Sequence, residues 1–186
     1  LVGLKYKGPF DDLEVQNMPG GFPFTNESLK EQGVTAVDCH KVLDGGKDNI
    51  GNDIVVAGEG TGIVHMATGC GAIDNKIGKK NNLVEIAPLD DEAKYLSGFG
   101  FLTGKLATSE STRDEIIQYL KENQFLLYSE DYPHVYPHCW RSGDELVYRS
   151  VDEWYINMDW RENIKKVVGD INWIPEWGHD REMEWL

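Results

Sequence analysis

The stretch Gly60-Thr61-Gly62-Ile63-Val64-His65, followed nine residues after the histidine by Asp74, decides how this chain is interpreted. The run 62–67 contains adjacent β-branched residues and is too short for a helix, so it predicts a strand that presents an imidazole. A bend of small residues follows at 67–71, and a carboxylate returns at the start of the next segment. This order predicts that His65 and Asp74 line a pocket.

The glycines at 58, 60 and 62 admit a second interpretation, a phosphate-binding loop after the predicted strand 53–57. A dinucleotide fingerprint has its third glycine one residue later and opens a helix whose N-terminus meets the phosphate. Here Ile63 and Val64 continue as a strand, which favours a hairpin turn. The hypothesis of a nucleotide-binding α/β domain therefore depends on these glycines alone.

His65 and Asp74 each have an ordinary structural explanation. A lone histidine in a strand is usually a packed or hydrogen-bonded residue, and Asp74 alone would be a helix cap. Found together within a glycine framework, they favour a functional site.

The motif resembles the editing domain of isoleucyl-tRNA synthetases, which reads Gly-Thr-Gly-φ-Val-His-x-Ala-Pro-x-x-Gly-x-x-Asp. Thr68 replaces the usual proline, and the matching residues are Gly60, Thr61, Gly62, Val64, His65, Ala67, Gly71 and Asp74. The valyl and leucyl relatives usually have lysine or methionine at the position of His65. Further blocks at 136–141 (YPHCWR), 151–156 (VDEWYI), 171–175 (INWIP) and 181–186 also resemble this family.

The resemblance implies hydrolysis of valine wrongly attached to isoleucine tRNA. Asp74 would hold the α-ammonium of the aminoacyl group through a charge-assisted hydrogen bond. His65 would contact the ribose or the aminoacyl group, or orient the water. The other implied substrate-binding residues are Gly60, Thr61, Gly62, Thr68, Gly71 and Ile73. No Ser-His-Asp or Cys-His nucleophile set is evident, which favours direct attack by a positioned water.

The same resemblance implies that this part of the enzyme holds no cofactor, since ATP and Mg belong to the synthetic site of the parent enzyme. The implied partners are the acceptor end of isoleucine tRNA and the remaining synthetase domains. A non-catalytic module that binds the acceptor end, or a purely structural fragment, is the alternative. The synthetic signature motifs and the threonine-rich editing peptide are absent, so we expect an excised part that deacylates weakly or not at all alone.

Composition limits these hypotheses. The 186 residues suffice for one domain with a core and a small appendage. No apolar run approaches the roughly 20 residues that span a bilayer, and three cysteines do not form a secreted disulfide framework. We expect a soluble, cytoplasmic protein. The formal charge of −14 argues against broad nucleic-acid binding.

Local patterns predict an α+β fold. The predicted helices are 74–80, 109–123 and 160–168, of which 109–123 has the clearest apolar stripe. The predicted strands are 1–6, 35–43, 53–57, 62–67, 125–129, 135–139, 145–151 and 153–158. The resemblance implies a β-barrel-like editing domain over 1–158, incomplete at its N-terminus and unpaired beside 62–67. Residues 159–186 would form a return segment toward the synthetic core.

Two remaining sets of residues have competing explanations. Cys139 and Ser142 stand where some relatives have a Cys-x-x-Cys zinc half-site, but serine is a poor ligand and Cys39, His40 and His134 lack the usual spacing. We therefore predict no metal. The aromatic residues Tyr132, Tyr136, Trp140, Tyr148, Trp154 and Tyr155 could form a core or stack on RNA bases, and Arg141 and Arg149 could meet phosphate. Tyr136, Trp140 and Arg141 are the predicted tRNA-binding residues.

Overall fold

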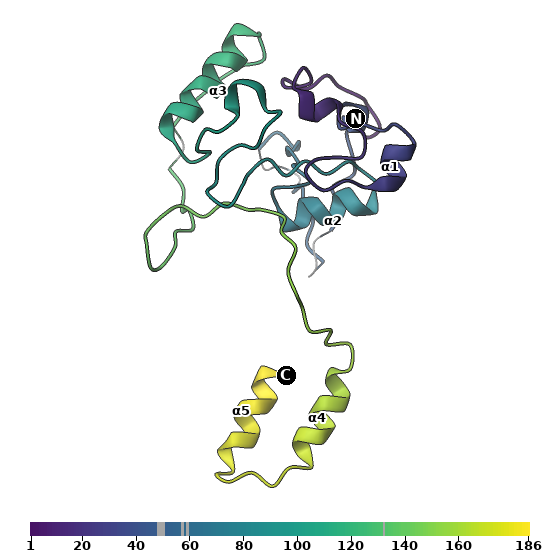
Figure 1. Ribbon diagram of the computed structural model, residues 1–186, viewed down its shortest axis with the longest axis vertical. Helices are drawn as coiled ribbons and strands as arrows, with labels where there is room; N and C mark the ends of the chain where they lie inside the picture. Colours follow the sequence, from purple (N-terminus) through teal and green to yellow (C-terminus); the bar gives the residue numbers. More distant parts are fainter. Residues whose placement is uncertain (48–50, 57, 59, 132) are drawn as a thin grey trace. The chain divides into compact units, whose positions relative to one another are not determined.

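The computed structural model describes residues 1–47, 51–56, 58, 60–131 and 133–186, which form two compact units (Figure 1). Unit 1 is Leu1–Ser150 and unit 2 is Val151–Leu186. The α-helices of unit 1 are α1 (Glu27–Glu31), α2 (Ala72–Lys80) and α3 (Glu110–Glu122), and its short 3-10 helices are η1 (Glu14–Asn17), η2 (Val37–Cys39) and η3 (Gly100–Leu102). Unit 2 contains α4 (Arg161–Gly169) and α5 (Trp177–Trp185).

The three helices predicted from the sequence are confirmed as α2, α3 and α4. α3 begins after the N-cap residue Ser109 and ends before Asn123, as its apolar stripe predicted. Its residue Ile116 packs on the main core cluster. Two helices were not predicted: α1, which has only five residues, and α5.

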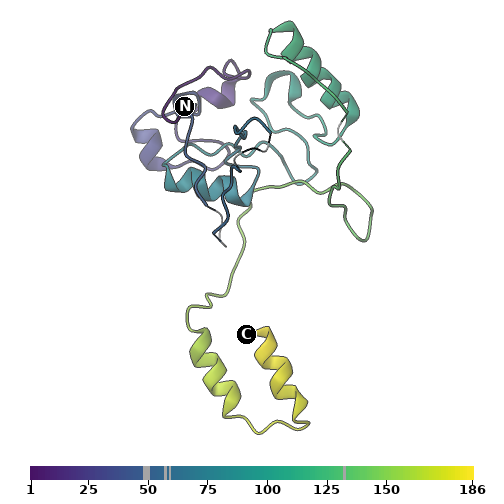
Figure 2. The same ribbon diagram turned by 180° about the vertical axis from the view of Figure 1, so that it is seen from behind.

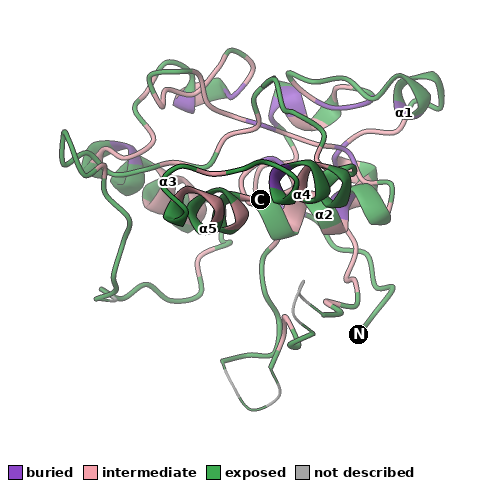
Figure 3. Ribbon diagram, turned by 90° about the horizontal axis from the view of Figure 1, so that it is seen from below, coloured by how far each residue is buried: buried purple, intermediate pink, exposed green. Residues whose placement is uncertain are grey.

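The main core cluster of unit 1 is small and consists of Leu13, Val15, Phe99 and Leu102. Val15 is fully buried. α3 is attached to this core by Tyr119, whose ring stacks with those of Phe10, at 5.3 Å between centroids, and Phe101, at 4.9 Å. A second cluster, Leu29, Ala36 and Val84, lies under α1. Most of the ribbon in Figure 3 has the green colour of exposed residues, and Val168 is the one buried residue among the described residues of unit 2.

The strand predictions are largely wrong. Among the described residues there is no strand, and backbone pairing consists of isolated bridges such as Lys5 with Lys41 and His138 with Glu145. η2 occupies the middle of the predicted strand 35–43. The segment 62–67 forms no bridge, and Gly60 and Gly62 have positive φ angles of 53° and 70°, which interrupt an extended chain. Ala57, the end of one predicted strand, lies outside the described residues.

The predicted β-barrel is therefore not confirmed. Extended segments of unit 1 meet at single residue pairs, without the consecutive pairs that make a ladder. The segments 125–129 and 153–158 form no bridge in the described part of the chain. What the structure does confirm of the predicted α+β fold is its helical part.

Unit 2 is a pair of helices. α4 and α5 run antiparallel and lie side by side in both views (Figures 1 and 2). The indole Nε1 of Trp173, in the connection between them, donates to the carbonyl oxygen of Val168 at 3.0 Å. The longest helix described has 13 residues, and none in the described ranges has the length and apolar character needed to cross a bilayer.

Candidate functional site

The glycine-flanked segment 60–65 is an exposed loop. The hydroxyl of Thr61 accepts from the backbone N–H of Ile63 at 3.2 Å and contacts the Ile63 carbonyl at 3.1 Å. This local turn replaces the predicted strand pairing. The side chain of His65 is exposed and makes no hydrogen bond or ion pair with any described residue. Its imidazole is therefore free to meet a ligand.

Asp74 lies in the first turn of α2, whose N-cap residue is Gly71. One carboxylate oxygen, Oδ2, accepts from the backbone N–H of Ala67 at 3.0 Å. A carboxylate in this position is also stabilised by the positive end of the helix dipole. Asp74 thus attaches the segment that follows His65 to the start of α2. The other oxygen, Oδ1, has no hydrogen-bond partner among the described residues.

A second set of hydrogen bonds fixes the loop between His65 and Asp74. The side-chain amide of Asn75 donates to the carbonyl oxygen of Thr68 and to Oε2 of Glu85, both at 2.9 Å. The hydroxyl of Ser150 donates to Oε1 of Glu85 at 2.6 Å. The side chains of Asn75 and Ser150, which are distant in sequence, therefore meet at the carboxylate of Glu85.

Close backbone packing also holds the loop between His65 and Asp74 in place. The hydroxyl of Thr68 donates to the carbonyl oxygen of Val84 at 3.0 Å. A Cβ at Gly78, on the facing side of α2, would lie 2.7 Å from the Thr68 methyl group. A Cβ at Gly69 would overlap with the carbonyl oxygen of Ile86. Glycine at 69 and 78 allows the loop to approach α2 and the 84–87 segment.

Cys70 lies within this polar cluster. Burial raises the pKa of its thiol, and the nearby carboxylates of Asp74 and Glu85 raise that pKa further. The thiol therefore stays protonated near neutral pH and is a poor nucleophile.

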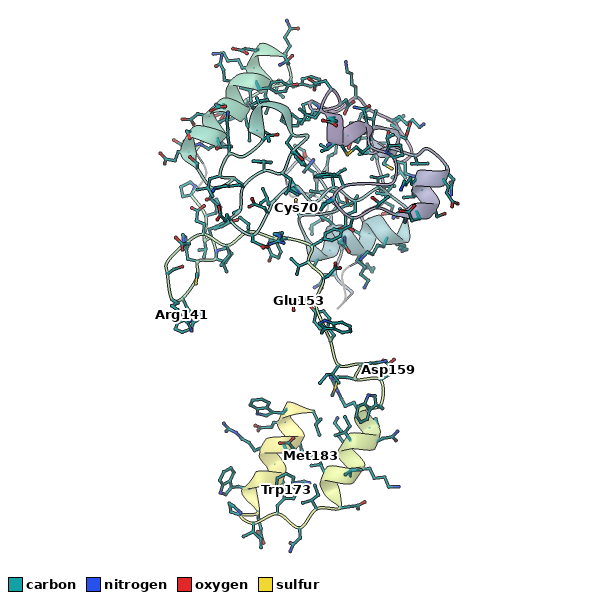
Figure 4. All side chains as sticks on the ribbon, viewed as in Figure 1. Cys70, Arg141, Glu153, Asp159, Trp173 and Met183 are labelled. Carbon is teal, nitrogen blue, oxygen red and sulfur yellow. The ribbon has the colours of Figure 1, made fainter. Side chains whose placement is uncertain are left out.

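The predicted tRNA-binding residues belong to a separate hairpin, 133–147. Trp140 has 87% of its surface exposed, and the guanidinium of Arg141 lies 4.7 Å above its ring. Arg141 lies near the tip of this hairpin (Figure 4). The hydroxyl of Tyr136 donates to the carbonyl oxygen of Leu146 at 2.9 Å. Among the described residues, no hydrogen bond or ion pair links these three to His65 or Asp74.

The other predicted site residues have varied positions. Gly60, Thr61 and Gly62 lie in the exposed loop, and Ile73 is 47% exposed on the first turn of α2. Tyr148, Trp154 and Tyr155 are exposed and do not contribute to a core. Tyr132 lies outside the described residues. Arg149 forms an ion pair with Asp91.

Sequence reasoning missed Asn75, Glu85 and Ser150. An amide directly after Asp74, in the first turns of a predicted helix, was a weak signal for Asn75. Glu85 and Ser150 carried no local signal. Within the described ranges, no three histidine, cysteine, aspartate or glutamate side chains converge as a metal site would require, and the three cysteines are free thiols.

No family model matches the chain. Among curated proteins, the isoleucine–tRNA ligase of Sulfolobus acidocaldarius is 36% identical over 182 residues, which cover 97% of this chain and 15% of that protein. The isoleucine–tRNA ligase of Aquifex pyrophilus is 31% identical over 97% of this chain and 32% of its own length. That of Petrotoga mobilis is 39% identical over 69% of this chain and 14% of its own length. The chain spans less than a third of each of these relatives.

Proposed function

Because the chain belongs to the isoleucine–tRNA ligase family, we propose that it carries an editing site that hydrolyses the ester of valine mischarged on isoleucine tRNA. A pocket that admits isoleucine cannot strongly exclude a side chain one methylene smaller, and isoleucine against valine is itself the standard example of this limit. A second site that destroys the wrong ester removes the error.

One observation carries the proposal. The carboxylate of Asp74 is fixed at the start of α2 through Oδ2, while Oδ1 has no partner in the described structure. An α-ammonium group is the part of an aminoacyl ester that such an oxygen binds best. The anchored loop brings the exposed His65 segment to the same end of α2.

The chemistry assigned to this site is attack by water on the ester carbonyl. Asp74 would orient the aminoacyl group through its ammonium. His65 would contact the ribose or hold the attacking water. Neither side chain needs to form a covalent intermediate, which agrees with the protonated state favoured for Cys70.

The barrel remains part of this proposal. Residues 63–65 are exposed, and the segment 62–67 forms no backbone bridge in the described structure, so it would offer an edge to which a further strand could bind. A wall added there would enclose the substrate beside His65.

The alternative is a non-catalytic module that binds the acceptor end of tRNA. The exposed ring of Trp140, covered by the Arg141 guanidinium, favours stacking on a base next to a phosphate. In that case Asp74 would act as a loop anchor only.

Substitutions at Asp74 separate the two functions. Asn can still accept from the Ala67 N–H, so Asp74→Asn keeps the loop anchored and removes only the charge. In a full-length ligase that contains this segment, we expect Asp74→Asn to slow deacylation of valine-charged isoleucine tRNA about tenfold to a hundredfold, with normal isoleucine activation. Asp114→Ala, an exposed carboxylate on α3, is the matched control. Unchanged deacylation by Asp74→Asn would make Asp74 an anchor and reject the editing role.

A further inference from the structure

The last two residues of unit 1, the exit segment 149–150, are both held by acidic side chains. The guanidinium of Arg149 pairs with the carboxylate of Asp91. The hydroxyl of Ser150 donates to Oε1 of Glu85 at 2.6 Å. The next residues, 151–157, are exposed and form no backbone bridge with any described residue. The chain therefore leaves unit 1 at a point that two side-chain contacts fix.

The two contacts of the exit segment differ in strength. The side chain of Asp91 is 90% exposed, so solvent screens its attraction to Arg149, and exposed ion pairs contribute little to stability. The hydrogen bond from Ser150 to Glu85 is partly buried. Hydrogen bonds to a charged group are also roughly twice as strong as those between neutral groups. The bond between Ser150 and Glu85 is therefore the main attachment of the exit segment.

The backbone of Glu85 has a fixed position. Its carbonyl oxygen accepts from the N–H of Phe22 at 3.0 Å, and the N–H of Ala87 donates to the carbonyl oxygen of Phe22 at 2.8 Å. Ile86, the next residue after Glu85, packs on both hydrophobic clusters of unit 1. The Glu85 carboxylate therefore extends from a part of the chain that the core holds in place.

The two oxygens of the Glu85 carboxylate bind two different segments. Oε1 accepts from Ser150, and Oε2 accepts from the side-chain amide of Asn75 at 2.9 Å. The same amide donates to the carbonyl oxygen of Thr68, in the loop between His65 and Asp74. A carboxylate bound at both oxygens has one orientation, and hydrogen bonds in such a network strengthen one another. Without Ser150, the Glu85 side chain is free to rotate, and Asn75 loses a fixed acceptor.

The thiol of Cys70 is a chemical reporter of this loop. Burial raises its pKa, and the carboxylates of Asp74 and Glu85 raise that pKa further. Rotation of Glu85 toward solvent would move one negative charge away from the thiol, and a loosened loop would expose the sulfur. Both changes increase the reactivity of Cys70, because only an accessible thiolate reacts.

From these contacts we infer that Ser150 and Glu85 are positioning residues that couple the exit segment to the loop before Asp74. With Ser150 bound, Glu85 and Asn75 keep the loop ordered, and displacement of the exit segment releases it. A pull on 151–157, the covalent connection to unit 2, acts directly on Ser150. The inference rests on the proposed function where it concerns deacylation, and it adds a means of regulating that site.

The first test uses the whole 186-residue chain and needs no tRNA. We expect Ser150→Ala to increase the rate at which iodoacetamide modifies Cys70 by about fivefold or more. Ser150→Thr keeps a hydroxyl and should restore the native rate. Cys39 packs on the second hydrophobic cluster and is an internal control, since general loosening would speed its modification as well. An unchanged Cys70 rate in Ser150→Ala, or an equal acceleration at Cys39, would overturn the inference.

A double-mutant cycle separates coupling from independent stabilisation. If Ser150 acts on the loop through the amide of Asn75, Ser150→Ala should change the Cys70 rate less than about twofold in a protein that already carries Asn75→Ala. Independent effects, in which the two substitutions multiply the rate, would reject the coupling. Ser111→Ala, at an exposed serine on α3, is the matched control and should leave the Cys70 rate unchanged.

Deacylation by a full-length ligase that contains this segment gives the functional measurement. We expect Ser150→Ala to slow deacylation of valine-charged isoleucine tRNA about threefold to tenfold, and Ser150→Thr to stay near the native rate. Normal deacylation by Ser150→Ala, beside slow deacylation by Asp74→Asn, would reject the positioning role. If Ser150→Ala accelerates Cys70 modification while Asp74→Asn deacylates normally, the coupling stands and the editing site is rejected.

Discussion

The loop at the start of α2 and the hairpin 133–147 both carry predicted functional residues, but they are held in different ways. The α2 loop is fixed by side chains from distant segments, through Asn75, Glu85 and Ser150. The hydrogen bonds that Tyr136 and His138 make with described residues stay within the hairpin. A site built from distant segments depends on the packing of unit 1, whereas a local one does not.

Two thiols report the same difference. Cys70, in the α2 loop, has a raised pKa because it is buried and lies near two carboxylates. Cys139, in the hairpin, has a lowered pKa, first because of a hydrogen bond with the Ser142 side chain and then because of backbone N–H groups of Ser142 and Arg141. One environment suppresses the thiolate and the other stabilises it.

The largest expected effect tests whether the α2 loop depends on close backbone packing. Gly69→Ala would force a Cβ against the Ile86 carbonyl oxygen, so we expect a loss of about 3 kcal/mol in the free energy of unfolding. Gly71→Ala, whose Cβ would make only ordinary contacts of 3.5 Å or more, should have little effect. Urea denaturation of both variants measures the difference. Equal stabilities would mean that the loop moves easily.

A smaller effect is expected when only the polar anchor is removed. Asn75→Ala deprives the Thr68 carbonyl and the Glu85 carboxylate of a donor, and we expect a loss of about 1–3 kcal/mol in unfolding free energy. Gln118→Ala, an exposed amide on α3 that contacts Glu122, is the control and should stay within about 0.5 kcal/mol. Thermal unfolding of each protein decides whether the anchor matters.

Thiol alkylation compares the two regions directly. At pH 7.5 we expect iodoacetamide to modify Cys139 several times faster than Cys70, because only the thiolate reacts. Ser142→Ala should raise the pKa of Cys139 and slow its modification several-fold. Mass spectrometry of peptides from the native protein measures both rates. Faster modification of Cys70 would contradict the two environments.

The smallest effect concerns alkaline pH. The pKa of the Cys70 thiol is raised in the folded state. The thiol therefore contributes fully to the free energy of unfolding below the ordinary thiol pKa, and this contribution declines as pH rises through the pKa of the folded state. We therefore expect the native protein to lose slightly more stability than Cys70→Ala between pH 8 and pH 10. If the stabilities of the two proteins fell in parallel over this pH range, the Cys70 thiol would make no such contribution.

Local signals in the sequence were sufficient for the helices and insufficient for the strands. α3 has its N-cap position at Ser109 and a regular apolar stripe, both readable within one segment. A strand needs a partner, and 62–67 has none in the described structure although its composition favours extension. Positive φ angles at Gly60 and Gly62 could not be deduced from glycine alone.

In the candidate site, too, some residues could be predicted from local sequence and others could not. Asp74 was found because a motif of fixed spacing includes it. Glu85 lies 10 residues from Asn75 and 65 from Ser150, so its hydrogen bonds depend on tertiary folding. The alternation of His134, Tyr136 and His138 is visible in the sequence, whereas their proximity to Thr108 around one hollow depends on tertiary folding.

The two oxygens of Asp74 have a thermodynamic consequence. If Oδ2 holds the Ala67 amide while Oδ1 receives a cation, loop closure and ligand binding share one carboxylate and become linked equilibria. A ligand that binds more tightly when the Ala67 N–H is bonded to Asp74 must also stabilise that hydrogen-bonded loop. The two effects have the same factor. The exchange of the Ala67 amide proton with solvent would slow in step with occupancy, which makes this single N–H a reporter of the site from within the backbone.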